Sequence, residues 1–532
     1  MPTLSWIGKK AVENHHRHVP FHLLKDMPEL SIGDPGSGNL IVEGDNLIAL
    51  KALLPYYAGQ VKCIIIDPPY NSGEQTWTYN DHVSSPEIRD WLNRTVGREF
   101  DDLTRHDKWL CMMYPRMSLL CQFLRDDGIL FVCLDDTELY RFRLMMEEVG
   151  LGISFVTTLV WKSRRNLDSR SKHNVSIDHE YVVVFKKPNA RFRGATKDFS
   201  KYSNPDNDPR GPWMSDNLVG LATKDRRPNL HYTLLDPSTG RKYACPAKGW
   251  RYSQETMARK IAEGRIIWPA KPTGRPRHKK FLNELESEFT GFSSIIECGN
   301  TNEGTEEVQQ ILGDAGFIFP KPKSLMVQLV QQAAPEENDI VLDSFAGSGT
   351  TGHSVLEVSK LENKNRRFIL VEMDSTIARN ITAQRIKRVA EGYTNSQGER
   401  VDGLGGGFRF ATLGDPLFDE KGNIRSTVRF GDLARHVYFT ETGEPMPRQV
   451  KATSPLIGRW RGKAIYLLYN GILKDKSPDG GNVLTTSVMR CLPAHDGPKV
   501  IFGTACRLGS ERLRREGIEF KQLPYKLKVG SL

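Results

Sequence analysis

The chain has 532 residues, which at about 150 residues per domain corresponds to three or four domains. Hydrophobic residues make up 39% and charged residues 26%, which excludes a mainly disordered, collagen-like or membrane-embedded chain. No apolar run reaches the roughly 20 residues that cross a bilayer, and the N-terminus lacks the apolar core of a signal peptide. Eight cysteines, none spaced C-x-x-C, form neither a disulfide scaffold nor a recognisable zinc site. We therefore expect a cytoplasmic protein.

The positive charge is concentrated in one segment. Lys and Arg exceed Asp and Glu by 74 − 64 = 10 over the whole chain, and residues 190–282 contain 20 Lys and Arg against 8 Asp and Glu. Aromatic residues are interleaved with these cations, and eight of them are Phe199, Tyr202, Trp213, Tyr232, Tyr243, Trp250, Tyr252 and Trp268. Cations neutralise phosphates and aromatic rings stack on bases, so the pattern favours nucleic-acid binding. A domain that uses these aromatics as its core has the same composition.

The first 35 residues are polar and interrupted by prolines, and we expect them to form an N-terminal extension. They include four histidines, at positions 15, 16, 18 and 22. No cysteine or carboxylate completes a recognisable ligand spacing with these histidines, so we expect no metal site.

Strand and helix patterns alternate over residues 36–189 and again over 316–400. Short apolar runs predict strands at 40–43, 61–66, 128–134, 154–161, 180–185, 340–342 and 367–372. Segments with helical patterning predict helices at 46–55, 114–125, 138–149, 324–332 and 351–361. This alternation predicts an α/β fold with a doubly wound, mostly parallel sheet, into which the basic region at 190–315 is inserted.

A glycine-rich stretch at 403–407 is expected to act as a linker to a small C-terminal α/β module, within residues 401–532. The module is predicted from strands at 464–469, 499–503 and 518–523 and from helices at 485–491 and 510–516. It contains no recognisable catalytic constellation.

A glycine-rich turn, DSFAGSGTT at 343–351, follows a predicted strand and opens a predicted helix. Its glycines allow the backbone to approach a ligand closely, and the helix N-terminus offers N–H groups to an anionic group. Glu372, at the end of the next strand, can hold ribose hydroxyls. These features fit a dinucleotide or another adenosine-bearing cofactor, and the lack of a following Lys excludes a P-loop.

A second motif, Asp67-Pro68-Pro69-Tyr70, directly follows the predicted strand at 61–66. Residues at the carboxyl end of a parallel strand face the crevice in which ligands bind. The two prolines fix the backbone, so an Asp67 oxygen and the Pro68 carbonyl can both accept hydrogen bonds from one –NH2 group. Tyr70 can stack on the ring that carries this group. A rigid turn without function is the simpler interpretation of the same residues.

Together, the two motifs resemble the amino-methyltransferases of DNA, which use S-adenosylmethionine. The aspartate–proline motif comes first, the basic region second and the glycine-rich motif last, which is the circularly permuted order of the β class. Further similarity lies in the segments GDN at 44–46, FVTTLVWKSR at 155–164, YSNPDNDPRGPW at 202–213, GRI at 264–266 and FPKP at 319–322. Over roughly residues 1–395 the chain looks like the adenine-specific modification subunits of type III restriction–modification systems.

The resemblance implies a Rossmann-like methyltransferase fold, with a catalytic half at 36–189, a target-recognition region at 190–315 and a cofactor half at 316–400. It assigns methyl transfer to N6 of a flipped-out adenine to Asp67, Pro68, Pro69 and Tyr70. It implies cofactor contacts from Asp45, Lys321, Ser324, Asp343, Phe345, Gly347, Gly349, Thr350, Thr351 and Glu372. We expect DNA contacts from Lys162, Arg164, Arg165, Arg210 and Trp213, although a solvated charge run explains the first three equally well.

Four alternatives remain open. An N4-cytosine methyltransferase shares the mechanism, but in that group the motif usually begins with Ser. An RNA methyltransferase can carry a similar motif without the large inserted basic region. A nicotinamide enzyme explains the glycines and Glu372 but leaves Asp67 to Tyr70 unused. A non-catalytic DNA-binding subunit does not need intact motifs.

The expected partners also follow from the resemblance. They are double-stranded DNA, a second copy of the chain and the other components of a restriction–modification or related phage-defence system. Residues 408–532 either dock a helicase or nuclease subunit or act as a stabilising appendage. No membrane association is expected.

Overall fold

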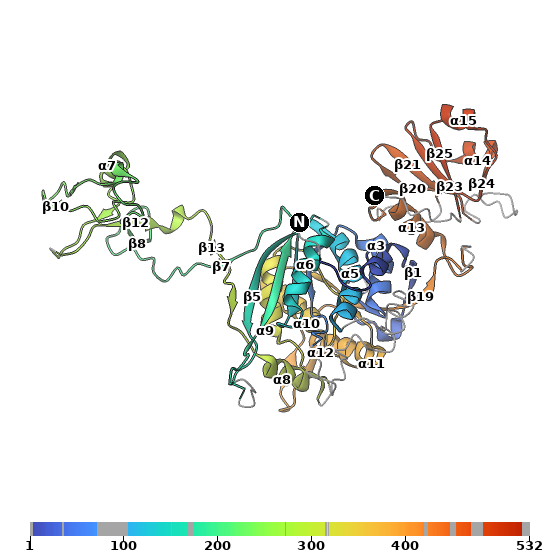
Figure 1. Cartoon of the computed structure of the whole chain (residues 1–532), viewed down its shortest axis with the longest axis horizontal. Coiled ribbons are helices and arrows are strands. Elements are labelled where there is room, and N and C mark those ends of the chain that lie inside the picture. The colour runs from blue at the N-terminus through green and yellow to red at the C-terminus, as the bar shows by residue number, and fades with distance from the viewer. Residues whose placement is uncertain are drawn as a thin grey trace. The chain divides into compact units, whose positions relative to one another are not determined.

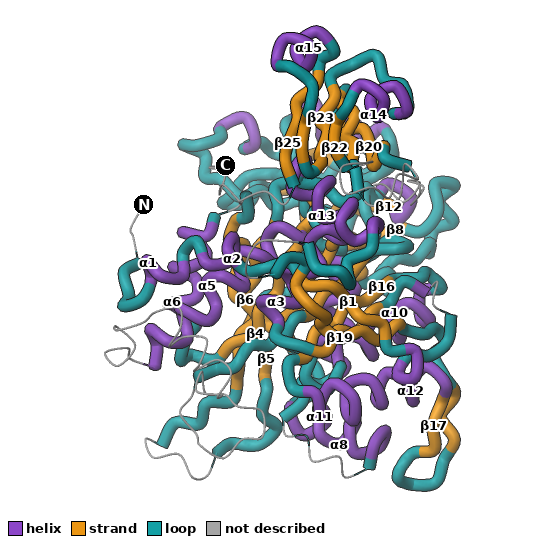
Figure 2. The backbone as a smooth tube through the Cα atoms, turned by 90° about the vertical axis from the view of Figure 1, so that its right-hand side faces the viewer, coloured by secondary structure: helices purple, strands orange, loops and turns teal. Residues whose placement is uncertain are grey.

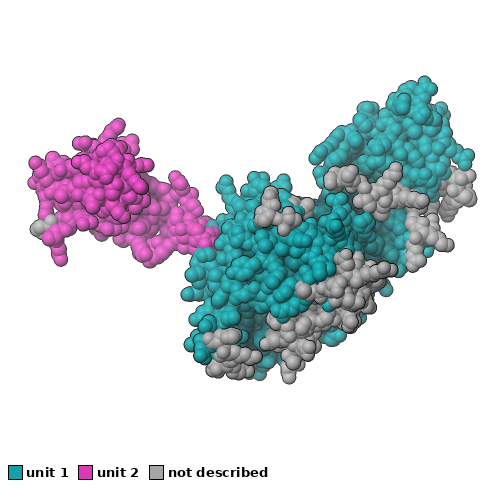
Figure 3. Space-filling model, viewed as in Figure 1, with its two compact units in different colours: residues 1–193, 293–532 teal, residues 194–292 magenta. Residues whose placement is uncertain are grey.

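The computed structural model describes residues 4–34, 37–71, 105–150, 152–168, 174–271, 273–313, 317, 319–419, 424–446, 454–469 and 482–523 (Figure 1). The chain forms two compact units, one of residues 194–292 and one of residues 1–193 and 293–532 (Figure 3). None of the described helices is long and apolar enough to span a membrane.

A ten-stranded sheet forms the centre of the larger unit (Figure 2). Its spatial order is β1, β19, β2, β16, β15, β3, β4, β6, β5 and β14. In that order the strands are His22–Asp26, Arg409–Pro416, Leu40–Glu43, Arg367–Glu372, Ile340–Asp343, Val61–Ile66, Leu124–Leu134, His179–Lys186, Ser154–Lys162 and Ile295–Ile296. The strands from β19 to β4 run parallel to one another, whereas β1 and β6 are antiparallel to the ends of this group. The predicted mostly parallel sheet is therefore confirmed.

Helices cover both faces of this sheet. Val42, Ile64 and Leu342 point to one face and share a hydrophobic cluster with α3, α5 and α6. Leu370 points to the other face, because a Cβ on Gly352 of α10 would lie 2.9 Å from its Cδ1. The helices are α1 Lys9–Val12, α2 His15–His18, α3 Asn46–Tyr57, α5 Arg105–Phe123, α6 Leu139–Val149, α8 Thr301–Leu312, α9 Lys323–Ala333, α10 Thr350–Glu362, α11 Ser375–Ile377 and α12 Ala383–Glu391. This arrangement is the doubly wound α/β fold that the sequence predicts.

Two neighbouring central strands, β15 and β3, are the strands that end in the sequence motifs. They pair in parallel, with Val341 opposite Cys63 and Leu342 opposite Ile64. From β3 the sheet continues to β4, and from β15 it continues in the opposite direction to β16. Such a switch in direction opens a crevice at the carboxyl ends of the two strands. The motif at 67–70 and the turn at 343–351 therefore meet at one edge of the sheet.

The smaller unit, residues 194–292, has its own core. Its strands are β7 Ala195–Thr196, β8 Trp213–Asn217, β9 Leu234–Leu235, β10 Lys242–Tyr243, β11 Ile266–Ile267, β12 Arg277–Phe281 and β13 Phe289–Thr290, and its helix is α7 Gln254–Ala262. Tyr243 and Trp250 are buried in this core, and Tyr232, Tyr252 and Trp268 pack against it. Five of the eight aromatics expected to stack on bases thus form the hydrophobic interior of the unit, as the alternative interpretation holds.

The C-terminal part contains a second, four-stranded sheet in the order β20, β21, β23 and β25. Its strands are Leu456–Trp460, Lys463–Leu467, Lys499–Gly503 and Ile518–Gln522, and the short pair β22 Val483–Leu484 and β24 Ala505–Cys506 lies outside it. Its helices are α13 Phe430–Thr442, α14 Thr486–Cys491 and α15 Ser510–Arg515. The predicted small α/β module is therefore present.

The structure differs from the expected division of the chain at both ends of the large sheet. β1 lies within the expected N-terminal extension and β19 within the expected C-terminal module, yet both are strands of the central sheet. The stretch 403–407 lies between β19 and the hairpin of β17 Gly392–Thr394 and β18 Arg400–Asp402. Gly407 accepts hydrogen bonds from Ser37 and Asn39, so this stretch is fixed to the sheet rather than acting as a linker. The inserted unit ends at residue 292, because β14 and α8 belong to the larger unit.

Candidate functional site

The motif after β3 is held in a rigid, largely buried turn. Pro68 and Pro69 are buried, and the Pro69 carbonyl accepts a hydrogen bond of 2.6 Å from the indole N–H of Trp109 in α5. The Tyr70 hydroxyl donates to Glu180 Oε2 at 2.8 Å. Burial, followed by the charges of Asp67 and Glu180, raises the pKa of Tyr70 well above its usual value, so the phenol stays neutral. The turn presents one carboxylate and one neutral phenol side by side.

Asp67 carries one occupied and one unoccupied oxygen. Its Oδ2 lies 2.9 Å from the Lys321 ammonium, whereas its Oδ1 is buried and has no hydrogen-bond partner among the residues that the structure describes. Burial raises the pKa of Asp67, and Lys321 opposes this rise. A buried polar atom without a partner is costly in a folded protein, which makes it a sign of a binding site. Asp67 Oδ1 is thus available to accept a hydrogen bond from a ligand.

Lys321 connects the two motifs. Its side chain is 8% exposed, its ammonium lies 3.3 Å from Glu180 Oε2 and 4.7 Å above the centre of the Tyr70 ring. Burial favours the neutral amine, but Asp67 and Glu180 outweigh it and raise the pKa of Lys321 above its usual value. Its backbone carbonyl accepts a hydrogen bond of 3.2 Å from the Thr350 hydroxyl. The sequence-based expectation was a cofactor contact, whereas the structure directs this ammonium to Asp67.

The turn after β15 is fixed by Asp343. Its Oδ1 accepts from the Phe345 N–H at 2.9 Å, and its Oδ2 accepts from the Thr351 hydroxyl at 2.6 Å. Burial raises the pKa of Asp343 to about 7. Gly349 precedes α10 with φ at 79°, a conformation that side chains rarely adopt, and a Cβ there would lie 3.2 Å from Thr382. Because Gly349 has no side chain, the turn packs closely against Thr382, the residue before α12, and α10 begins directly after it.

Like Gly349, the predicted cofactor residues Glu372, Asp45 and Ser324 are not among the residues that line the cavity described below. Glu372 is 2% exposed and accepts from the Gly347 N–H at 2.8 Å and the Asp374 N–H at 3.0 Å. Asp45 caps α3 and pairs with Arg116 at 3.0 Å. Ser324 accepts from the Gly299 N–H at 2.9 Å. Each side chain therefore holds backbone or another side chain, and its contact with a cofactor stays a prediction.

A cavity of about 770 Å³ brings the two motifs together. Small-molecule sites typically enclose volumes of this size. The predicted residues that line it are Asp67, Pro68, Pro69, Tyr70, Arg164, Arg165, Lys321, Asp343, Phe345, Gly347, Thr350 and Thr351. Lining residues that the sequence did not indicate include Asp135, Glu180, Phe317 and Met326, whereas Phe319 and Ser348 lie within the quoted motifs without having been assigned a contact. The convergence of two segments far apart in the chain on one cavity is the central geometric finding.

Two groups that the sequence did not indicate, Glu180 and Arg385, hold the motifs in place. Glu180 is the second residue of β6, which pairs with β4, and contacts both Lys321 and Tyr70. Arg385, fully buried in α12, donates to Ser348 Oγ at 2.9 Å and to Thr350 Oγ1 at 2.8 Å. A charged residue on the apolar side of an amphipathic helix was the available signal for Arg385. A carboxylate at the start of an otherwise apolar strand was the signal for Glu180.

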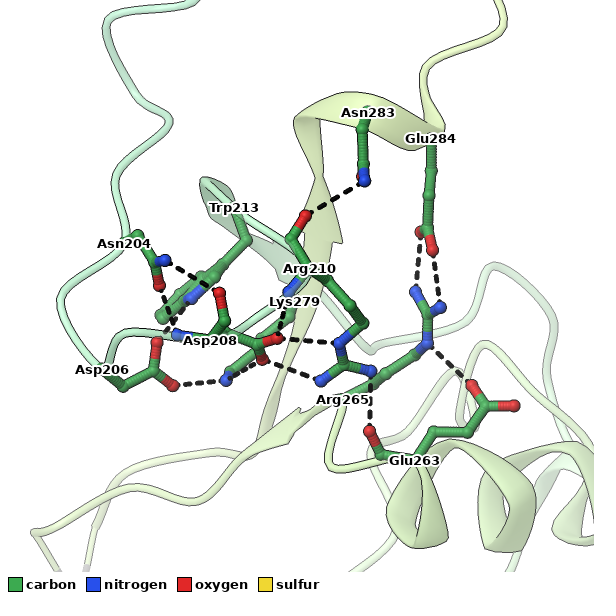
Figure 4. A network of polar contacts seen from close by, with 10 residues as sticks. All are labelled: Asn204, Asp206, Asp208, Arg210, Trp213, Glu263, Arg265, Lys279, Asn283 and Glu284. Carbon is green, nitrogen blue, oxygen red and sulfur yellow. Dashed lines mark hydrogen bonds and ion pairs between the residues drawn. The ribbon is translucent and has the colours of Figure 1, made fainter.

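The residues expected to contact DNA occupy different environments. Arg164 pairs with Asp168 at 2.9 Å and lines the cavity with Arg165, while Lys162 is exposed at the end of β5. Arg210 and Trp213 lie in a polar network of the smaller unit (Figure 4).

In that network the guanidinium of Arg210 donates to both oxygens of Asp208 at 2.8 and 2.7 Å and to the Glu263 carbonyl at 2.7 Å. The Trp213 indole donates to Asp206 at 2.8 Å, and Lys279 joins Asp206 and Asp208 (Figure 4). These contacts cross-link the strands of the unit, so a structural role accounts for Arg210 and Trp213.

Comparison with known proteins matches residues 61–384 to a family model described as DNA methylase. The chain is 29% identical over 449 residues to the StyLTI Mod subunit, a type III restriction-modification protein of Salmonella typhimurium, with 76% of this chain and 66% of that subunit covered. It is 26% identical over 424 residues to the EcoP15I Mod subunit of Escherichia coli, with 70% and 64% covered. The match thus spans just under two thirds of the length of these relatives. Among solved structures, M1.HpyAVI aligns with a TM-score of 0.30 and 14% identity over 65% of this chain and 98% of that chain.

Proposed function

This chain belongs to the DNA methylase family, and from that premise we propose that it transfers a methyl group from S-adenosylmethionine to N6 of adenine in double-stranded DNA. One observation carries the proposal. Within the described part of the chain, Asp67 Oδ1 is buried without a hydrogen-bond partner, and Asp67 lines the same cavity as the glycine-rich turn. An acceptor in that position fits an exocyclic amine, and the adjacent turn fits an adenosine-bearing cofactor.

The residues present fit S-adenosylmethionine. When bound, this cofactor supplies a methyl group on a positively charged sulfur. Phe345, Gly347, Thr350 and Thr351 line the cavity beside the N-terminus of α10, and Asp343 adds a carboxylate there. We propose that these residues hold the cofactor, with Glu372, Gly349 and Arg385 fixing the turn from behind.

The reaction needs little chemistry from the protein beyond positioning. An N–C bond forms, an S–C bond breaks and one proton leaves the nitrogen. The target base must first leave the duplex, at a cost of a few kcal/mol. Asp67 Oδ1 and the Pro68 carbonyl would then accept the two N–H groups of the amine, and the Tyr70 ring would stack on the base. Alignment of this kind makes the transfer effectively unimolecular.

The substitution Asp67→Ala tests the proposal. We expect it to reduce methyl transfer at least about a hundredfold while the protein still folds and binds DNA, because the amine loses its acceptor. The assay follows labelled methyl groups from the cofactor into genomic DNA from a host that lacks this chain. Asp126→Ala, which removes an exposed carboxylate away from the cavity, is the matched control. Full activity of the Asp67 variant would refute the assignment.

The base that carries the label decides between the candidate reactions. We expect N6-methyladenine, because the motif of this chain begins with Asp, as in the adenine-specific enzymes that it resembles, whereas the motif of N4-cytosine methyltransferases usually begins with Ser. N4-methylcytosine would establish the cytosine alternative. A wild-type protein that binds DNA and transfers no methyl group would establish the non-catalytic alternative.

The names of the relatives support a wider assignment. Two of them are Mod subunits of type III restriction-modification enzymes, so we propose that this chain acts within such a system and therefore in the cytoplasm, where its DNA substrate lies. We propose that it forms a homodimer and that the module within 408–532 docks a helicase or nuclease subunit. Exposed cations of the smaller unit, among them Lys224, Arg226 and Arg227, are the proposed contacts with DNA phosphates.

A further inference from the structure

The cavity contains two charged side chains, those of Lys321 and Glu180, that the methyl-transfer proposal does not use. The Lys321 ammonium lies between two carboxylates, at 2.9 Å from Asp67 and 3.3 Å from Glu180, and above the Tyr70 ring. The same Glu180 oxygen accepts the Tyr70 hydroxyl. Lys321 and Glu180 reach the motif from a loop before α9 and from β6, so neither belongs to the motif itself.

We propose that Lys321 and Glu180 are positioning residues that act through Asp67. Lys321 keeps Asp67 ionised and turned so that Oδ1 faces the target amine, and Glu180 keeps Lys321 in place beside Tyr70. This inference rests on the proposed methyl transfer, and it differs from the sequence-based assignment of Lys321 to the cofactor.

The contacts of the ammonium support this role. A buried carboxylate avoids its charged form unless a cation or donor compensates it. The hydrogen bond from Lys321 engages Oδ2, and Oδ1 is left as the acceptor. Because the carbonyl of Lys321 holds Thr350, the same residue also ties the ionised carboxylate to the cofactor turn.

The described titratable groups that interact with Asp67 enter the expected pH dependence. They are Lys321 before α9, Glu180 in β6, Tyr70 in the same turn, Cys133 in β4 and Asp343 at the end of β15. Burial raises the pKa values of Tyr70 and Cys133 well above their usual values, so both stay neutral. Burial raises the pKa of Asp343 to about 7, and the charges of Asp67 and Glu372 add to this rise.

Two substitutions are expected to shift the pH profile of methyl transfer in opposite directions. The single-turnover rate falls at low pH as Asp67 becomes protonated, which gives the rate profile an acid limb. Lys321→Met removes the neighbouring cation, so this acid limb moves to higher pH by about 1–3 units. Glu180→Gln keeps an amide oxygen that can accept from Lys321 and Tyr70 but removes a neighbouring anion, so the limb moves to lower pH. Rates are measured from pH 5 to 9 at saturating cofactor and DNA, and Lys321→Arg is expected to return the limb toward the wild-type position.

Cofactor affinity separates this role from direct cofactor binding. We expect Lys321→Met to bind S-adenosylmethionine within about twofold of wild type in calorimetry. An affinity loss above tenfold without a shifted limb would overturn the proposal, as would limbs that coincide or move in the same direction. If Lys321→Met is inactive or unfolded, the direction of the limb in Glu180→Gln decides alone. A wild-type protein without any methyl transfer would refute the proposed function instead, which is a separate result.

Discussion

The ionisation of Asp343 is expected to govern cofactor affinity near neutral pH. This carboxyl is buried, it lines the cavity and its pKa is raised by burial to about 7. Because the raised pKa exceeds the usual value, the negative charge is lost as the pH falls through about 7. The carboxylate is ~90% ionised at pH 8 and only ~10% at pH 6. A cofactor with a positively charged sulfur binds the ionised form better.

The expected effect is therefore a loss of affinity of about tenfold, or ~1.4 kcal/mol, between pH 8 and pH 6. In Asp343→Asn this dependence should disappear, because the amide does not titrate. The turn should survive, since the amide oxygen can accept from the Phe345 N–H while the amide nitrogen donates to the Thr351 hydroxyl, replacing the bonds that Asp343 now makes.

Isothermal titration calorimetry with S-adenosylmethionine measures both proteins at pH 6, 7 and 8. The cofactor's own titration is common to the two series, so it cancels in the ratio of their dissociation constants. A ratio that stays constant over this range would refute the reasoning, as would a wild-type affinity that rises on acidification.

Other features of the structure give three further predictions. Arg385→Met removes the hydrogen bonds to Ser348 and Thr350, and we expect about tenfold weaker cofactor binding in calorimetry; unchanged affinity would contradict a role of α12 in fixing the turn. Arg227→Glu should make the plot of log association constant for DNA against log salt concentration less steep, by about 1 or more in slope. An identical slope would show that this exposed residue does not contact DNA phosphates. Deleting residues 430–532 keeps β19 in the sheet, so methyl transfer should persist while copurification with a coexpressed helicase or nuclease subunit is lost; retained copurification would rule out docking through this module.

The centre of the sheet could be predicted from the sequence. The strands at 40–43, 61–66 and 367–372 have the bounds predicted for them. A strand buried on both faces is a continuous apolar run, so its signal is independent of its neighbours. The positions of the two motifs follow as well, because each directly succeeds such a strand.

The edges of the sheet could not be predicted in this way. β1 and β19 pair with each other across almost the whole chain, through backbone hydrogen bonds that any sequence can form. β1 is only partly buried and contains two charged residues, so its pattern is too weak to indicate a strand. The predicted start of α5 at residue 114 is also wrong. The helix includes residues from Arg105 onward, and the polar residues of its first turn carry no apolar pattern that would indicate them.

The directions of polar side chains could not be predicted from the sequence either. Glu372 and Asp45 follow the predicted strands, but their oxygens accept backbone N–H groups of neighbouring turns. Arg210 was expected to reach DNA, yet Asp208, two residues away, binds its guanidinium. Position along a strand fixes where a side chain begins, whereas its partner depends on segments that only the fold brings near.

Asp67 and Asp343 show how two equivalent positions acquire different properties. Asp67 directly follows β3, Asp343 is the last residue of the neighbouring parallel strand β15, and burial raises the pKa of both carboxyls. Lys321 opposes this rise at Asp67, whereas the contacts described for Asp343 are those with a hydroxyl and a backbone N–H. Asp67 is therefore suited to remain a charged acceptor during catalysis, and Asp343 is suited to change its charge when a cation binds. If the proposed function holds, the pH dependence of cofactor binding and that of methyl transfer belong to different carboxylates, and the two should respond to different substitutions.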